Sequence, residues 1–149
     1  DKPMPNRAVL KVIENRDLLT VTPDMNVRAV ASQMKQCKVA ALLVVDQRDG
    51  KLIGICTERD LTFKVLAEGL DINSTLVGSV MTADPQSIGP DKPFGHALHM
   101  MFEGGFRHMP VIDSDGRPLG VISSRDALGL EVTHFGSELE QRETLTEIL

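Results

Sequence analysis

Aromatic residues are almost absent from this sequence of 149 residues, which has no Trp, no Tyr and only five Phe. Proteins that bind single-stranded nucleic acid stack bases on aromatic side chains, so we do not expect this function. The formal net charge of −5 also argues against nucleic-acid binding driven by phosphate contacts. No apolar run approaches the roughly 20 residues that cross a bilayer, and no signal peptide is visible, so we expect no membrane partner.

Cysteine is scarce, and the common catalytic motifs are missing. Cys37 and Cys56 suggest neither a metal-ligand set nor a disulfide framework, which favours a reducing, cytoplasmic location. The sequence has no G-x-S-x-G, no H-E-x-x-H and no Walker A glycine loop, so we expect no enzyme. His96 and His99 are three residues apart and His108 follows, but no acidic residue or Cys completes a convincing ligand set, so no metal is expected.

The sequence does contain an internal repeat. Three pairs of segments match: residues 22–24 (TPD) with 89–91 (GPD), 43–46 (LVVD) with 110–113 (PVID), and 54–61 (GICTERDL) with 120–127 (GVISSRDA). A single unit of roughly 60 residues would be marginally stable alone, so we expect the two units to pack together. A pseudo-twofold axis between them would place equivalent residues face to face, so a site in one unit implies a related site in the other.

Each unit predicts the same order of elements, β-α-β-β-α, and the fold class is therefore α+β with small sheets covered by helices. The expected elements are strand 19–21, helix 27–36, strand 39–45, turn 46–50, strand 52–56 and helix 57–67, followed by strand 87–88, helix 94–102, strands 106–112 and 119–122, and a helix from Ser123. The helix at 27–36 rests on apolar residues at helical spacing, and the run 39–45 is apolar without alternation, as in a buried strand.

The repeat divides the chain into three parts: a first unit at 9–68, a second unit at 76–130 and an acidic tail at 131–149. Short apolar-periodic stretches at 9–14 and 77–81 lead into the two units. The tail alternates Leu and Ile with Glu from residue 137 onward, which is typical of an amphipathic helix. Such a helix packs on its own domain or docks to a partner or a second subunit, and the sequence leaves both open.

Two motifs of the form T/S-x-x-D each follow an apolar strand and open a helix: Thr57 with Asp60, and Ser123 with Asp126. A hydroxyl at the N-cap with a carboxylate three residues later is typical of a capping box, here with Asp in place of Glu. Two helix starts across one cleft would also suit a phosphate, and a carboxylate can accept both hydroxyl hydrogens of a ribose. The capping and ligand roles are compatible, because a hydroxyl has more than one hydrogen-bonding direction.

The pattern TPD, then VVD-x-x-x-G-x-x-x-GI-x-T-x-RDL, resembles a CBS motif, named for cystathionine β-synthase. The tandem pair resembles a Bateman module over about residues 9–130. The resemblance implies one pseudo-twofold α+β module that binds an adenine nucleotide (AMP, ADP, ATP or NAD) between its units. Binding would favour one orientation of the units and so regulate a dimer contact or an unidentified effector protein.

The resemblance also implies roles for individual residues. Thr57 and Ser123 would approach phosphate, and Asp60 and Asp126 would hold ribose. The remaining residues that the resemblance places around the ligand are Arg59 and Arg125 beside the motif Asp residues, Val39, Ala40 and Ala41 at the second strand of unit one, Phe106, Arg107 and His108 at the second strand of unit two, and Val21, Ile88 and Met81 near adenine. Each arginine of the motifs could instead face solvent.

The two predicted sites differ in charge, because Arg107 and His108 occupy slots that hold Ala40 and Ala41 in the first unit. The sequence also departs from the family pattern where Leu43 replaces the proline kept as Pro110. Neither this change nor Gly89 in place of Thr22 removes a proposed polar ligand group. The resemblance further implies a homodimer. An alternative function is an interaction or assembly module whose cleft is empty or holds another small molecule.

Overall fold

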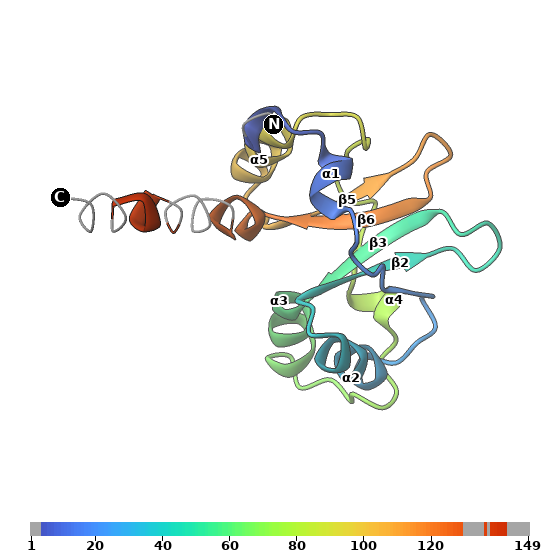
Figure 1. The fold of residues 1–149 in the computed structure, drawn as a ribbon. Helices are drawn as coiled ribbons and strands as arrows, with labels where there is room; N and C mark the ends of the chain where they lie inside the picture. Colours follow the sequence, from blue (N-terminus) through green and yellow to red (C-terminus); the bar gives the residue numbers. More distant parts are fainter. Residues whose placement is uncertain (1–3, 130–135, 137, 143–149) are drawn as a thin grey trace.

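The computed structural model describes residues 4–129, 136 and 138–142 (Figure 1). The first half contains η1 (Met4–Asn6), α1 (Val9–Ile13), β1 (Thr20–Val21), α2 (Val27–Cys37), β2 (Ala41–Val45), β3 (Leu52–Thr57), α3 (Glu58–Asp60) and the π-helix η2 (Leu61–Leu66). The second half contains α4 (Val77–Val80), β4 (Thr82–Ala83), α5 (Phe94–Gly104), β5 (His108–Ile112), β6 (Pro118–Ser123) and a helix at 125–129. Residues 136 and 138–142 are helical, and the rest of the predicted tail helix lies outside the described residues.

The predicted β-α-β-β-α order is confirmed in both units. The strands of the first unit, joined by β4 from the second half of the chain, form a sheet of order β1-β2-β3-β4, in which β1 is parallel to β2 and the other pairs are antiparallel. In the second, β5 and β6 form an antiparallel pair. The predicted strand at 87–88 reduces to one parallel bridge between Ile88 and Val111, because Ile88 alone makes both ladder hydrogen bonds. Strand β4 was not predicted, since its two residues are exposed and show no alternation.

The short helix before each unit packs into the core of the other unit. Val9 and Ile13 of α1 lie in a cluster with Phe94, Met101, Met109 and other residues of the second unit. The helix α4 lies at the start of the second unit, yet its Val77 lies in the core of the first unit. The chain therefore exchanges α1 and α4 between the units, and each core contains residues from both halves of the sequence.

Matched backbone hydrogen bonds fix this exchange. The N–H of Val9 donates to the carbonyl oxygen of Lys92 at 2.8 Å, and the N–H of Val77 donates to that of Met25 at 2.8 Å. Met25 and Lys92 occupy equivalent positions, 67 residues apart, just before α2 and α5. Each exchanged helix is thus held at the start of the long helix of the opposite unit.

The two sheets also contact each other directly. Val121 of β6 packs against the cluster of Ala41, Leu43 and Ile55 from β2 and β3. At the hairpin turns, the N–H of Leu52 donates to the carbonyl oxygen of Gly116 at 2.9 Å. The hairpin turns therefore lie together at one end of the module, and the helix starts that follow β3 and β6 lie at the other end (Figure 1).

Truncation of the exchanged helix tests this packing. Val9 is fully buried, so Val9→Ala should lower the free energy of unfolding by about 2 kcal/mol through lost burial and a residual cavity. The neighbouring residue Leu10 is 50% exposed, so Leu10→Ala should change it by no more than about 0.5 kcal/mol. Urea denaturation of the two variants checks the difference, and equal effects would contradict the exchanged packing.

Candidate functional site

Both T/S-x-x-D motifs cap the helices that they open, which confirms the capping interpretation. At the first motif, the N–H of Asp60 donates to Thr57 Oγ1 at 3.3 Å, and the N–H of Thr57 donates to Asp60 Oδ2 at 3.0 Å. At the second motif, the N–H of Ser123 donates to Asp126 Oδ2 at 2.8 Å, and the N–H of Arg125 donates to Ser123 Oγ at 3.2 Å. The surroundings of the two carboxylates nevertheless differ.

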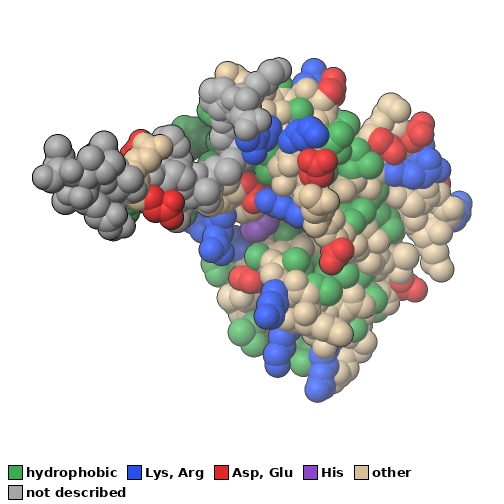
Figure 2. Space-filling view, viewed as in Figure 1, with side chains coloured by type: hydrophobic (Ala, Val, Ile, Leu, Met, Phe, Trp, Pro, Cys, Tyr) green, Lys and Arg blue, Asp and Glu red, His purple; other side chains and the backbone are tan. Residues whose placement is uncertain are grey.

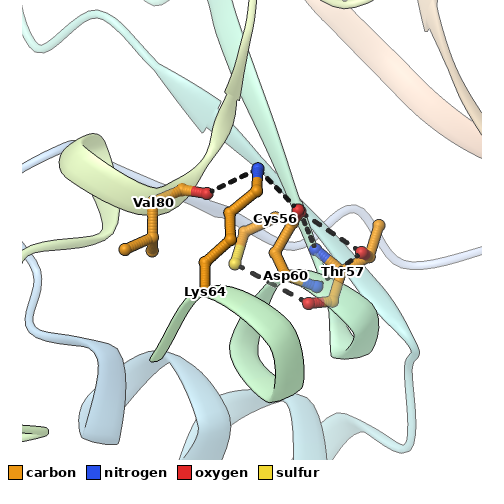
Figure 3. A network of polar contacts seen from close by, with 5 residues as sticks. All are labelled: Cys56, Thr57, Asp60, Lys64 and Val80. Carbon is orange, nitrogen blue, oxygen red and sulfur yellow. Dashed lines mark hydrogen bonds and ion pairs between the residues drawn. The ribbon is translucent and has the colours of Figure 1, made fainter. Parts of the chain in front are cut away.

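The first carboxylate is buried and held by an ion pair. Asp60 is 8% exposed, and its Oδ1 lies 2.9 Å from Nζ of Lys64, one turn later in η2 (Figure 3). Nζ of Lys64 also donates to the carbonyl oxygen of Val80 in α4 at 3.1 Å. The Asp60 carboxylate therefore joins the first motif to the exchanged helix, and its acceptor capacity is used within the protein.

The two cysteines lie in opposite environments. Burial, with a smaller contribution from the Asp60 carboxylate, raises the pKa of the Cys56 thiol to about 12, although Lys64 acts in the other direction. Cys56 is therefore a neutral core residue at physiological pH. Cys37 is exposed at the end of α2 and lines the cleft described next.

The second motif opens into a cleft of about 910 Å³ between the two units. Figure 2 shows a histidine side chain in the hollow between the two halves, with Lys and Arg side chains around it. The residues that line the cleft are Arg16, Asp17, Leu18, Leu19, Gln36, Cys37, Val39, Ala40, Ala41, His108, Val121, Ser123, Arg125 and Asp126. The cleft thus combines the linker and the β2 start of the first unit with the T/S-x-x-D motif of the second.

Arg16 forms a bidentate ion pair with Asp126 across the cleft. Its Nη1 donates to Asp126 Oδ2 at 3.0 Å, and its Nη2 donates to Oδ1 at 2.7 Å. The Asp126 side chain is 13% exposed, and the Arg16 side chain is 43% exposed. Sequence reasoning missed Arg16, because it lies in the linker before β1 and belongs to no motif. The pair positions the carboxylate at the cleft wall with a cation beside it.

His108 contributes an imidazole to the same cleft. Burial is the main cause that lowers its pKa, and the guanidinium of Arg107 acts in the same direction. The carboxylates of Glu58 and Asp126 act in the opposite direction and only partly offset the burial. His108 is therefore neutral at pH 7 and can donate one hydrogen bond and accept another.

The structure brings together only some of the predicted ligand residues. Those that line the cleft are Val39, Ala40, Ala41, His108, Ser123, Arg125 and Asp126; those that do not are Thr57, Arg59, Asp60, Phe106, Arg107, Val21, Ile88 and Met81. Val21 and Ile88 are core residues, each 5% exposed. The guanidinium of Arg59 lies over the ring of Phe63, 4.9 Å from its centroid. Roles for the residues outside the cleft stay predictions.

The histidines considered for a metal do not gather into a ligand set. Nε2 of His99 lies 3.1 Å from Oε1 of Glu103 on the exposed face of α5. Within residues 4–129, 136 and 138–142, no three His, Cys, Asp or Glu side chains gather in a metal-binding arrangement. In the same part of the chain, no helix has the length and apolar character needed to cross a membrane.

A family model for the CBS domain matches residues 10–67 and again residues 77–132. This chain belongs to the CBS-domain family. Among curated proteins, the CBS domain-containing protein CBSCBSPB1 of Arabidopsis thaliana is 36% identical over 121 residues, covering 81% of this chain and 21% of the relative. The chain thus spans about a fifth of the length of that relative. An uncharacterized 17.7 kDa protein of Acidianus ambivalens is 32% identical over 133 residues, covering 87% of this chain and 79% of that protein.

Solved structures agree with the family assignment. A CBS-domain-containing protein from Agrobacterium tumefaciens is 31% identical, with a TM-score of 0.74 over 84% of this chain and 99% of its own. A CBS domain protein from Pyrobaculum aerophilum, complexed with AMP, shares the fold at 20% identity, with a TM-score of 0.75 over 86% of this chain and 99% of its own. The predicted α+β fold of two CBS repeats is confirmed.

Titration of His108 should make the CBS pair less stable in mild acid. Because its folded pKa is lowered, the folded state binds a proton less readily than the unfolded chain, in which the value is near 6.5. Above about pH 6.5, His108 should therefore not lower the melting temperature. Below that pH, the melting temperature should fall as the pH decreases. The variant His108→Gln, melted over the same pH range, should lose less stability; parallel profiles would contradict this account.

Proposed function

We propose that this CBS pair is a regulatory module that binds an adenine nucleotide in the cleft at Ser123 and Asp126. The observation that carries the proposal is an open cleft of about 910 Å³ whose wall presents a motif carboxylate, two arginines and a neutral imidazole. This volume lies within the range of small-molecule sites. Two structural neighbours, the Pyrobaculum protein and CBSX2, are AMP complexes, which supports the class of ligand.

Asp126 is the proposed ribose-binding group. Its carboxylate accepts two hydrogen bonds from Arg16 and one from the N–H of Ser123, which leaves little of its acceptor capacity free. A ribose diol would therefore replace at least one bond from Arg16. The released guanidinium stays at the cleft wall, where it can pair with a phosphate.

The other lining residues supply the remaining parts of a nucleotide site. Apolar side chains at the β1 and β2 starts, among them Leu18, Leu19 and Val39, offer a surface for adenine. Arg125 and His108 lie on the opposite unit and offer hydrogen-bond donors for phosphate. AMP, ADP, ATP and NAD all contain both an adenine base and phosphate.

The first motif remains a proposed second site. Binding of ribose by Asp60 would require the ion pair with Lys64 to open, and the predicted contributions of Thr57, Phe106 and Arg107 would act there. We infer that the Asp126 cleft fills first, because Asp126 lines the cleft of about 910 Å³ whereas Asp60 lines neither this cleft nor the cavity beside it.

The proposed role is regulatory and not catalytic. The nucleotide would bridge residues of both units and favour one mutual orientation, which an effector protein or a second subunit would sense. The competing function is an assembly module without a nucleotide. The two are distinguished by melting the protein with AMP, because a ligand at 100-fold its dissociation constant adds about 2.7 kcal/mol of stability.

Removal of the motif carboxylate should weaken AMP binding. Asp126→Asn should reduce the affinity by about ten- to a hundredfold, because the ribose hydroxyls lose a charged acceptor. Asp115→Asn removes the same charge from an exposed hairpin turn and should leave the affinity unchanged. Isothermal titration calorimetry measures both variants.

Chemical labelling of the exposed thiol of Cys37 tests where AMP binds. Cys37 lines the proposed cleft, whereas burial keeps Cys56 inert, so a maleimide should label Cys37 alone. AMP at a concentration that just saturates the wild type should slow this labelling in the wild type and much less in Asp126→Asn. Full labelling in the presence of bound AMP would place the nucleotide elsewhere.

The module should also form a homodimer through its helices. Large apolar side chains stand exposed on helices of both units, with Leu66 of η2 74% exposed and Phe102 of α5 86% exposed. Burial of these side chains against a second copy would remove them from water. Light scattering should give about twice the chain mass of 16.3 kDa, and Leu66→Glu should shift the mass toward one chain. A wild-type monomer at tens of micromolar would contradict the dimer.

A further inference from the structure

A second cavity adjoins the nucleotide cleft. It has a volume of about 690 Å³ and lies between the C-terminal end of α2 and the helical segment that begins at Glu58. Val39, Ala40 and Arg125 line both cavities, so the two cavities adjoin at these residues. A ligand seated at Asp126 could therefore continue past Arg125 without leaving the surface of the protein.

The charged lining of this second cavity is mainly basic. Lys35, Lys38 and Arg125 contribute three cations, and Glu58 contributes one carboxylate. Within the part of the chain that the structure describes, neither lysine has a carboxylate at ion-pair distance. An unneutralised group of cations in a concave surface attracts an anion, and a chain of phosphates matches several cations better than a single phosphate does.

The backbone of Lys38 also distinguishes it from its counterpart in the second unit. Lys38 ends α2 in the left-handed region, with φ 55° and ψ 45°, where glycine is favoured because a Cβ atom is crowded. The equivalent residue 67 positions later is Gly105, which ends α5 with φ 72° and ψ 28°. The other described non-glycine residues with positive φ are Asn15 and Asp84, which tolerate this region better than lysine does. The first unit thus holds a lysine where the second unit holds the less strained residue.

We propose that the second cavity is a polyphosphate subsite that makes this CBS pair selective for a nucleoside di- or triphosphate over a monophosphate. The ribose and first phosphate would lie at Asp126 and Arg125, and the outer phosphates would pair with Lys35 and Lys38. This inference rests on the adenine-nucleotide function proposed above.

The test compares ATP with AMP by calorimetry in magnesium-free buffer. The wild type should bind ATP about tenfold or more tightly than AMP. Lys38→Gly and Lys35→Gln should each reduce the affinity for ATP by about five- to tenfold and leave that for AMP within about twofold. Lys38→Gly should also melt at or above the wild-type temperature, because glycine relieves the left-handed backbone, so lost affinity cannot be ascribed to unfolding. Lys92→Gln removes an equal charge outside both cavities and should preserve the preference.

The outcomes separate the two proposals. Equal affinities of the wild type for ATP and AMP, or an unchanged preference in both Lys38→Gly and Lys35→Gln, would overturn the subsite and leave the nucleotide function standing. Failure of the wild type to bind either nucleotide would overturn both.

Discussion

The exchange of α1 and α4 between the units is the constraint on which the rest of this structure depends. Val9 and Ile13 complete the core of the second unit, and Val77 completes that of the first, so neither unit has a full core without the other half of the sequence. Small units bury too little surface to be stable alone, and the exchange makes each core depend on residues from both halves of the chain. It also fixes the relative position of the helix starts that bound the cleft.

The exchange has a direct consequence for the two motif carboxylates. Nζ of Lys64 contacts both the Asp60 carboxylate and the carbonyl oxygen of Val80 in α4. The first motif is therefore linked to an exchanged helix. Arg16 follows α1 in the linker and pairs with Asp126, so the second motif is tied to the linker. The two cations are about equally exposed, with the Lys64 side chain at 46% and the Arg16 side chain at 43%. The motifs differ in that Asp126 lines the cleft between the units whereas Asp60 does not, and this difference supports the proposed site at the second motif.

Much of the fold follows from local patterns, whereas the site depends on contacts that such patterns do not contain. The period of apolar residues predicts α2, because it depends on neighbours in sequence. The dipeptides Asp49-Gly50 and Asp115-Gly116 are local turn signals and mark both hairpins for the same reason. The ion pair of Arg16 with Asp126 joins residues 110 positions apart, and no motif marks Arg16. Lys64 is different, because a cation four residues after Asp60 on a predicted helix is a readable i,i+4 pair. The matching position in the second unit is Leu130, so the sequence itself shows that the second motif lacks a cation four residues after its Asp.

A structure of the protein with bound ATP tests the central claim most directly, namely that the Asp126 cleft is the nucleotide site. This account predicts that the ribose hydroxyls hydrogen-bond to the Asp126 carboxylate, that Arg16 has left at least one of its two contacts there, and that the Lys64–Asp60 pair is intact. A nucleotide seated at Asp60 with the Arg16–Asp126 pair undisturbed, or a cleft that stays empty at saturating ATP, would contradict it.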